Sequence, residues 1–439
     1  MAIRRGHVEV FHDDQIVVAQ PDLDIVKQSL TRLGVVLGPV EENAELRLAL
    51  LRDLGNIEAA VHVLRQDSGI GPQLDRFGAE RHDLGRGDPA PLDLLVKGVL
   101  LQLAGIFPGW TVEIGKNYRP SYVRGYPHIG GGGDGDPVPA EITPGPPGFG
   151  RDLDPQTGRG VRVAVLDTLM FPDPWLTGRY IASPEDILDP EQGHFTVFDG
   201  HCAFVSSCIL RQAPAAEIHV RPVLGADGDG SAWDAAIAIA ETARAGAHVV
   251  NLSFGEYRTD DDSAPMVLRT AVERLGSDIV VVAAAGNNGD VNNMPAELVP
   301  AGVKPDSVSY PAALPDVVGV GALDRNGDLA AFTPHPAPWI RLLAPGVGLN
   351  GAYVRGMVTI EHKDRNGNVL NSNPVYFPGR AIWEGCSFAA AVVSGAIAAG
   401  TVPGHRSARQ ALDELLHPDP ARHDRRIRPA APAGLARSR

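Results

Sequence analysis

The segment Val-Arg-Val-Ala-Val-Leu-Asp-Thr, residues 161–168, decides the fold of this chain. Its first six residues are mostly apolar and β-branched, which is typical of a parallel strand buried on both faces. Asp167 ends this run, at the end of a strand where open α/β sheets place their functional sites. Because a buried carboxylate is costly without a partner, we expect Asp167 to accept a hydrogen bond from another side chain. The alternative is an Asp that caps the following turn.

Strands and helices alternate along the chain from residue 160 onward. Apolar runs predict buried strands, and runs of helical periodicity between them predict helices. Repeated strand–helix–strand units predict an α/β fold, with a doubly wound parallel sheet and helices on both faces. The predicted strands span residues 217–223, 247–252, 278–285 and 317–322, and the predicted helices span residues 231–245, 266–275 and 387–399.

Two more segments hold side chains that are able to act with Asp167. His201 stands in Asp-Gly-His-Cys-Ala-Phe-Val, and Ser387 stands in Gly-Cys-Ser-Phe-Ala-Ala-Ala. Acyl transfer needs a nucleophile, a base that takes its proton, and a group that orients the base. Each residue alone has an ordinary explanation, because a His at a helix start is usually structural and a Ser there is a common helix cap. The three together favour catalysis.

Asn287 is the candidate donor for a developing oxyanion. It follows an apolar strand, residues 279–285, and Gly286. Its side-chain amide, together with the backbone N–H of Ser387, would stabilise the negative charge of a tetrahedral intermediate. The alternative is a plain turn, because Asn-Asn-Gly is an ordinary turn signal.

In their order Asp, His, Ser, these segments resemble the subtilisin-like serine peptidases, or subtilases. The resemblance implies a subtilisin-like fold and a serine endopeptidase that works through an acyl-enzyme. It also implies that Asp167, His201 and Ser387 form the triad, with Asn287 in the oxyanion hole. This chemistry requires no cofactor and no metal. The likeness runs from about residue 161 to residue 400 and includes residues 223–233, 249–255, 309–313 and 343–346.

The same resemblance implies a cleft in which an extended protein or peptide substrate pairs with two edge strands. Main-chain hydrogen bonds would hold any sequence there, while side-chain pockets would select. Four acidic residues predict a preference for Arg or Lys near the scissile bond: Asp227, Asp229 and Glu256 lie on or near these strands, and Glu384 lies near Ser387. The implied substrate-binding residues are Gly228, Asp229, Gly230, Ser253, Phe254, Gly255, Ala284 and Gly286.

Several residues depart from the family pattern. Leu169 stands where the family usually has Gly, and the neighbours of His201 and Ser387 are also changed, to Cys202, Ala203, Phe204, Cys386, Phe388 and Ala391. These changes motivate a rival hypothesis, a catalytically silent fold that binds peptides, because a fold alone does not establish activity. A second rival is an acid-acting relative with a carboxylate in place of the His, and His201 in its expected context argues against it.

Two differences in length also stand out. The stretch from His201 to Pro214 is short and lacks the loop that binds calcium in many relatives, so we expect no strong calcium site there. Residues 351–377 form an insertion before the Ser387 segment. They predict a hairpin whose Asn-Gly turn lies within residues 364–368.

The chain divides into four regions by composition and pattern. Residues 1–118 predict a separate, smaller α+β domain, with helices at residues 22–33 and 91–106 and a strand at residues 110–114. Residues 119–158 are a Gly/Pro-rich linker, residues 159–402 the peptidase domain, and residues 403–439 a basic, Pro/Arg-rich tail that we expect to be solvated. The N-terminal domain is either a proregion that inhibits the enzyme or a permanent regulatory or docking domain.

Charge and cysteine content bound the partners and the compartment. The net charge of −14 argues against nucleic acid and anionic membranes as partners, because both repel an acidic protein. Three cysteines make no disulfide framework. Cys202 and Cys386 flank catalytic candidates and are either small buried residues or thiols whose oxidation would crowd the site. The first residues contain no long apolar run, so we expect a cytoplasmic protein.

Overall fold

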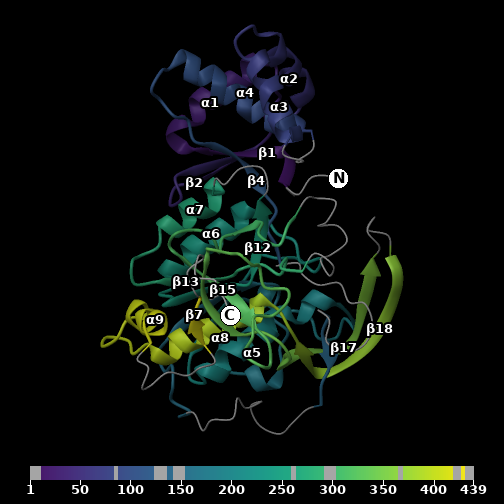
Figure 1. Cartoon of the computed structure of the whole chain (residues 1–439), viewed down its shortest axis with the longest axis vertical. Helices are drawn as coiled ribbons and strands as arrows, with labels where there is room; N and C mark the ends of the chain where they lie inside the picture. Colours follow the sequence, from purple (N-terminus) through teal and green to yellow (C-terminus); the bar gives the residue numbers. More distant parts are fainter. Residues whose placement is uncertain are drawn as a thin grey trace, which may run out of the picture.

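The computed structural model describes residues 11–83, 88–122, 136–141, 154–258, 264–290, 303–363, 369–418 and 427–430. Its largest sheet has the strand order β19-β16-β15-β13-β11-β7-β10-β8, and all neighbours are parallel except β16 and β19. The parallel sheet confirms the predicted α/β fold (Figure 1). Its strands are β7 (Arg162–Asp167), β8 (Tyr180–Ile181), β10 (Glu217–Pro222), β11 (Val249–Leu252), β13 (Val280–Ala284), β15 (Val317–Leu323), β16 (Ile340–Pro345) and β19 (Arg428–Pro429).

Helices cover both faces of this sheet because its strands are apolar on both faces. In β7, Val163 and Val165 pack in one buried cluster with helices α5 (His201–Gln212), α8 (Cys386–Gly400) and α9 (Ala408–Leu416). The alternate residues, Ala164 and Leu166, pack in a second cluster with α6 (Ala232–Arg244) and α7 (Met266–Glu273). Successive side chains of a strand point to opposite faces, so the side chains of β7 pack against the helices on both faces of the sheet.

The N-terminal domain is a four-stranded antiparallel sheet with helices on its outer side (Figure 1). The side chains of β1 alternate between two cores. Ile16 and Val18 pack with the domain's own helices, while Val17 packs in the same buried cluster as α6 and α7. The sheet therefore joins the N-terminal domain to the peptidase domain through an apolar face. Its elements are β1 (Phe11–Ala19), β2 (Val40–Asn43), β3 (Leu48–Leu51), β4 (Ile114–Tyr118), α1 (Leu23–Arg32), α2 (Ile57–Gln66), α3 (Gly71–Asp83) and α4 (Pro91–Ile106).

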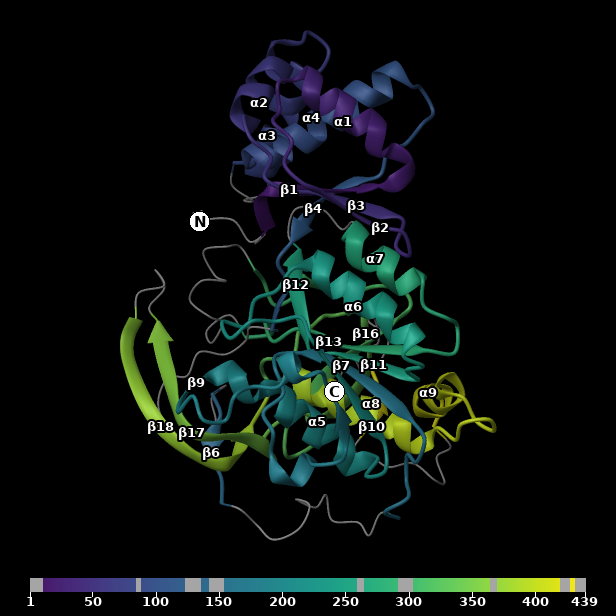
Figure 2. The same ribbon diagram turned by 180° about the vertical axis from the view of Figure 1, so that it is seen from behind.

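A long antiparallel ribbon projects from the peptidase domain beside the main body (Figures 1 and 2). It consists of β17 (Leu349–Lys363) and β18 (Val369–Trp383), and it is the predicted hairpin, although the predicted turn at residues 364–368 lies outside the described residues. Two short strands pair with it: β9 (His194–Thr196) with the middle of β17, and β6 (Val138–Pro139) with the base of β18. The ribbon ends just before α8, so it connects directly to the segment that holds Ser387.

Three expectations need correction. The predicted solvated tail after residue 402 is partly folded. Helix α9 buries Ala411 and Leu412 against the peptidase domain, and β19 joins the edge of the main sheet. The last strand of the N-terminal domain is β4 at Ile114–Tyr118, four residues later than predicted. Parts of the predicted linker pair as strands, whereas its glycine run at residues 130–133 lies outside the described residues. Within the described ranges, no helix is long and apolar enough to span a membrane.

Candidate active site

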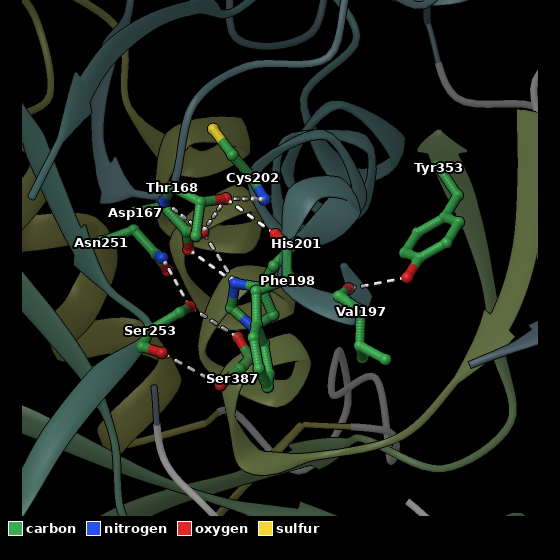
Figure 3. Close-up of polar contacts among 10 residues, drawn as sticks. All are labelled: Asp167, Thr168, Val197, Phe198, His201, Cys202, Asn251, Ser253, Tyr353 and Ser387. Atoms are coloured by element: carbon green, nitrogen blue, oxygen red, sulfur yellow. Dashed lines mark hydrogen bonds and ion pairs between the residues drawn. The ribbon is translucent and has the colours of Figure 1, made fainter. Parts of the chain in front are cut away.

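Asp167 and His201 meet at the carboxyl end of the main sheet. Asp167 is the last residue of β7 and is fully buried, and His201 is the first residue of α5. The imidazole Nδ1 lies 2.7 Å from Asp167 Oδ1 and 2.9 Å from Oδ2 (Figure 3). An ionised carboxylate only accepts hydrogen bonds, so Nδ1 carries the proton and donates it. In the neutral imidazole, Nε2 then remains as the acceptor, which is the state a general base requires.

Thr168 holds this pair in place. Its backbone N–H donates to Asp167 Oδ1 at 2.8 Å, and its hydroxyl donates to the carbonyl oxygen of Phe198 at 3.0 Å (Figure 3). The same hydroxyl oxygen accepts from the backbone N–H of Cys202 at 3.4 Å. Thr168 therefore links the end of β7 to the start of α5. Sequence reasoning did not single it out, because a Thr after a strand carries no signal of its own.

Two aromatic rings enclose the imidazole. The ring centroid of His201 lies 5.5 Å from that of Trp383, at the end of the ribbon, and 5.3 Å from that of Phe388, the residue after Ser387. Trp383 also contacts Tyr353 of β17, at 5.6 Å between ring centroids. All of these side chains are buried, so the inserted ribbon forms one wall of the site. Trp383 was also missed by sequence reasoning, since its role depends on packing between distant segments.

Ser387 lies in the first turn of α8 and is 4% exposed. Its hydroxyl donates to the backbone carbonyl oxygen of Ser253 at 3.1 Å, and the Ser253 hydroxyl donates to the carbonyl oxygen of Ser387 at 3.0 Å (Figure 3). Among the hydrogen bonds of the described residues, none joins Ser387 to His201. Such bonds often form only in the substrate complex, and a serine hydroxyl changes between staggered rotamers easily. We interpret the observed orientation as a resting rotamer.

The backbone before Ser387 requires a glycine. Gly385 has φ +153°, a region that L side chains rarely adopt. Its N–H donates to the carbonyl oxygen of Gly346 at 2.8 Å, which anchors the turn into α8. The helix N-terminus that follows favours negative charge at Ser387.

Asn287 lies against this same turn. Its side-chain Oδ1 accepts from the backbone N–H of Cys386 at 2.9 Å. Because a backbone N–H can only donate, this contact assigns the amide orientation and leaves Nδ2 as the donor side. Nδ2 lies close to Gly385, 3.6 Å from the position that a Cβ would occupy there. Ala284 and Gly286 lie just before Asn287, at and after the end of β13.

The two predicted cleft segments flank a short strand from the start of the predicted linker, directly after the N-terminal domain. β12 (Phe254–Arg258) pairs antiparallel with β5 (Ser121–Tyr122), with Phe254 opposite Tyr122 and Gly255 opposite Ser121. On the other side, the N–H of Gly230 donates to the carbonyl oxygen of Pro120 at 2.8 Å. Residues 120–122 thus run between the segments 228–230 and 253–255.

Ser253 is a predicted cleft residue whose polar side chain is fully buried. Its hydroxyl accepts from Asn251 Nδ2 at 2.9 Å, and Asn251 Oδ1 in turn accepts from the hydroxyl of Ser394 at 2.9 Å. A buried polar chain therefore runs from the middle of α8 back to its first turn. Asn251 and Ser394 carried no sequence signal, because only the packing of α8 on β11 brings them together.

The cysteines beside the site are buried and unreactive. Cys202 and Cys386 are fully buried, and burial raises the pKa of the Cys386 thiol to about 12 and that of Cys202 well above its usual value. The thiolate is the reactive form of cysteine. Both thiols therefore stay protonated at neutral pH, and the structural explanation of these cysteines is favoured over thiol sensitivity.

Part of this chain is similar to known proteins. The sequence model of the subtilase family matches residues 158–401. Subtilisin BL from Lederbergia lenta is 36% identical over 203 residues, which are 45% of this chain and 68% of that protein. An alkaline protease from Shouchella clausii is also 36% identical over 203 residues, which are 48% of its length. The solved structure of the prenylagaramide maturation protease PagA is 24% identical, with a TM-score of 0.40, and covers 56% of this chain and 75% of that one.

Proposed function

This chain belongs to the subtilase family and is a serine endopeptidase, and we propose that it cleaves peptide bonds with Asp167, His201 and Ser387 under the control of its own N-terminal domain. The single observation that carries the catalytic assignment is the contact of Asp167 with His201 Nδ1, at 2.7 Å and fully buried, at the N-terminus of α5. That contact fixes the tautomer that a general base needs.

The proposed reaction follows from the positions of four side chains. Ser387 attacks the peptide carbonyl while His201 Nε2 takes its proton, and Asp167 stabilises the imidazolium that forms. Asn287 Nδ2 and the backbone N–H of Ser387 stabilise the oxyanion. His201 then gives its proton to the leaving amine, and water releases the acyl group from Ser387.

The proposed control rests on the strand that lies in the cleft. An extended peptide that adds to a sheet edge is the mode by which a peptidase cleft holds substrate. Residues 120–122 make contacts of this kind with Gly230 on one side and with Phe254 and Gly255 on the other. A substrate cannot use the same hydrogen bonds at the same time. We therefore propose that the N-terminal domain inhibits the enzyme until this segment is cut or displaced.

Contacts outside the cleft support a domain held firmly in this position. Trp233, at the start of α6, donates its indole N–H to Glu41 at 2.8 Å and its backbone N–H to Asn117 at 3.1 Å. Arg244 pairs with Glu45 at 3.1 Å, at the other end of the same helix. These polar contacts surround the apolar face that β1 and β3 share with α6 and α7.

The test is mass spectrometry of the purified full chain beside its Ser387→Ala variant. We expect the wild-type chain to cut itself and a casein substrate, and the variant to do neither. Ser277→Ala, which alters an exposed serine, is the matched control and should behave like wild type. Equal cleavage by the wild-type chain and Ser387→Ala would overturn the assignment, and a wild-type chain that cuts nothing would favour the silent peptide-binding fold.

We also propose that the enzyme works inside the cell. Cys202 and Cys386 are free thiols directly beside His201 and Ser387. The cytosol keeps thiols reduced and its proteins seldom form disulfides, and all three cysteines of this chain are free. Fractionation of the source cells should find the protein in the cytosol, and its recovery from the culture medium would contradict this proposal.

A further inference from the structure

The strand that occupies the cleft carries a charged side chain at its upstream end. Arg119 Nη2 lies 3.7 Å from Asp229 Oδ2. The next residue, Pro120, is the one whose carbonyl oxygen accepts from the N–H of Gly230, and Tyr122 pairs with Phe254. The ion pair therefore belongs to the same run of chain that makes the β-type contacts of the cleft.

This ion pair is partly shielded from water. The side chains of Arg119 and Asp229 are 20% and 17% exposed. Shielding strengthens the attraction between opposite charges relative to a pair on the open surface. Asp229 lies between Gly228 and Gly230, within the segment that flanks the cleft-bound strand, and its carboxylate lies 3.7 Å from the guanidinium at the upstream end of that strand.

We propose that Asp229 is a specificity-determining residue, which selects Arg or Lys in substrates three positions before the residue that pairs with Phe254. The inference rests on the proposed function, because it treats residues 119–122 as standing in for a substrate. The substrate class is an extended peptide of the pattern Arg/Lys-x-x-x, whose last residue occupies the place of Tyr122.

A neighbouring acidic side chain has a different role. Asp227 is exposed, and its Oδ1 accepts from the backbone N–H of Asp229 at 3.1 Å, which is a turn contact. Asp227→Asn keeps an acceptor at this position and removes one negative charge close to Asp229. It is therefore a matched control for the charge of Asp229.

The surroundings leave room for a long basic side chain. An open surface hollow of about 460 Å³ lies beside the ion pair, and its lining includes Arg119, Asp229, His12 and Asp234. His12 belongs to the N-terminal domain and Arg119 to the segment that follows it, and both would leave when this domain and its segment are released. Asp229 and Asp234 would remain, and both would favour a cation in the vacated space.

The experiment measures kcat/KM of the full chain, after self-processing, for synthetic peptides. The parent peptide carries the sequence of residues 116–127, and two others replace its Arg119 by Ala or Glu. We expect wild type and Asp227→Asn to prefer the Arg peptide over the Ala peptide about tenfold, with the Glu peptide poorest. Asp229→Asn should cleave the Arg and Ala peptides at nearly equal rates, and Asp229→Lys should prefer the Glu peptide.

The outcomes separate this inference from the proposed function. Equal cleavage of all three peptides by the wild-type chain would overturn the role of Asp229 and leave the peptidase assignment intact. A preference for Arg that survives unchanged in Asp229→Asn would also overturn it. Cleavage of no peptide would remove the proposed function, and this inference with it. Reversal of the preference in Asp229→Lys shows that charge decides, since a merely structural role of Asp229 would not reverse it.

Discussion

At the scale of single residues, the site is built by contacts that orient donors and acceptors. Asp167 accepts from the N–H of Thr168 and from His201, so both the carboxylate and the imidazole have one allowed orientation. Asn287 is fixed in the same way, because its Oδ1 accepts from Cys386. The fixed orientation matters because preorganised groups need no rearrangement when charge develops in the transition state.

The first prediction concerns Asp167. Asp167→Asn keeps the size of the side chain, but its amide favours the wrong tautomer of the His201 imidazole. We therefore expect kcat to fall about 10⁴-fold. Steady-state kinetics on a peptide substrate check this value, and circular dichroism checks that the fold is retained. A fall of less than tenfold in a folded variant would show that Asp167 does not orient His201.

A second prediction concerns the oxyanion donor. Asn287→Ala removes Nδ2 close to Gly385, and we expect kcat to fall about 10²–10³-fold with KM little changed, the loss known for this donor in subtilisin. The split between kcat and KM is the informative readout, because a substrate-binding residue would change KM instead. Unchanged kcat would place the oxyanion elsewhere.

At the scale of elements, the base of the ribbon and the start of α8 together enclose the catalytic imidazole. Trp383 ends β18 and contacts His201 and Phe388, and Tyr353 of β17 packs on Trp383. A buried tryptophan at such a junction holds two elements together through its large contact area.

Trp383→Ala is therefore expected to lower the free energy of unfolding by about 3–5 kcal/mol, because the cavity cannot collapse fully in a packed core. Tyr376→Ala, on the same strand but 57% exposed, is the control and should change stability by less than about 0.5 kcal/mol. Denaturant unfolding of both variants in the Ser387→Ala background measures the difference. Equal losses in the two variants would contradict the role of Trp383.

Most of the peptidase domain could be predicted from sequence because its strands and helices are long and strongly patterned. The residues predicted for β7, β13 and α8 agree with the structure within two residues at each end. The helix at residues 91–106 has the predicted bounds. Three contacts could not be predicted: the second face of β1 packs on α6 and α7, β19 returns to the sheet edge, and β5 enters the cleft. Each joins distant segments, and no local pattern encodes which surface a short strand will meet.

At the scale of the whole molecule, the N-terminal domain packs on the peptidase domain through one apolar core, and the segment that follows it, residues 120–122, lies in the cleft. His12 lies at this junction, in the lining of the same surface hollow as Arg119 and Asp229. Burial lowers the pKa of His12 below its usual value of 6.5, and the charge of Arg119 lowers it further, against the opposing effects of Asp14 and Asp234.

This shift predicts that acid loosens the two domains. The docked state binds the His12 proton less readily than the released state, so docking loses stability as the pH falls below about 6.5. We expect hydrogen exchange at the Gly230 amide, which donates to Pro120, to accelerate at pH 5.5 relative to pH 7.5 in the Ser387→Ala chain. His12→Gln should remove most of this acceleration after correction for intrinsic exchange. Equal acceleration in both proteins would show that His12 is not the group responsible.

The central claim is that folding makes Asp167, His201 and Ser387 act as one nucleophilic unit. The most direct test is labelling with a fluorophosphonate, which reacts with an activated serine, followed by peptide mapping. We expect one adduct, on Ser387, in the self-processed chain, and its loss in His201→Ala. No adduct on Ser387 once the N-terminal domain has been removed, or an adduct that persists in His201→Ala, would contradict the account.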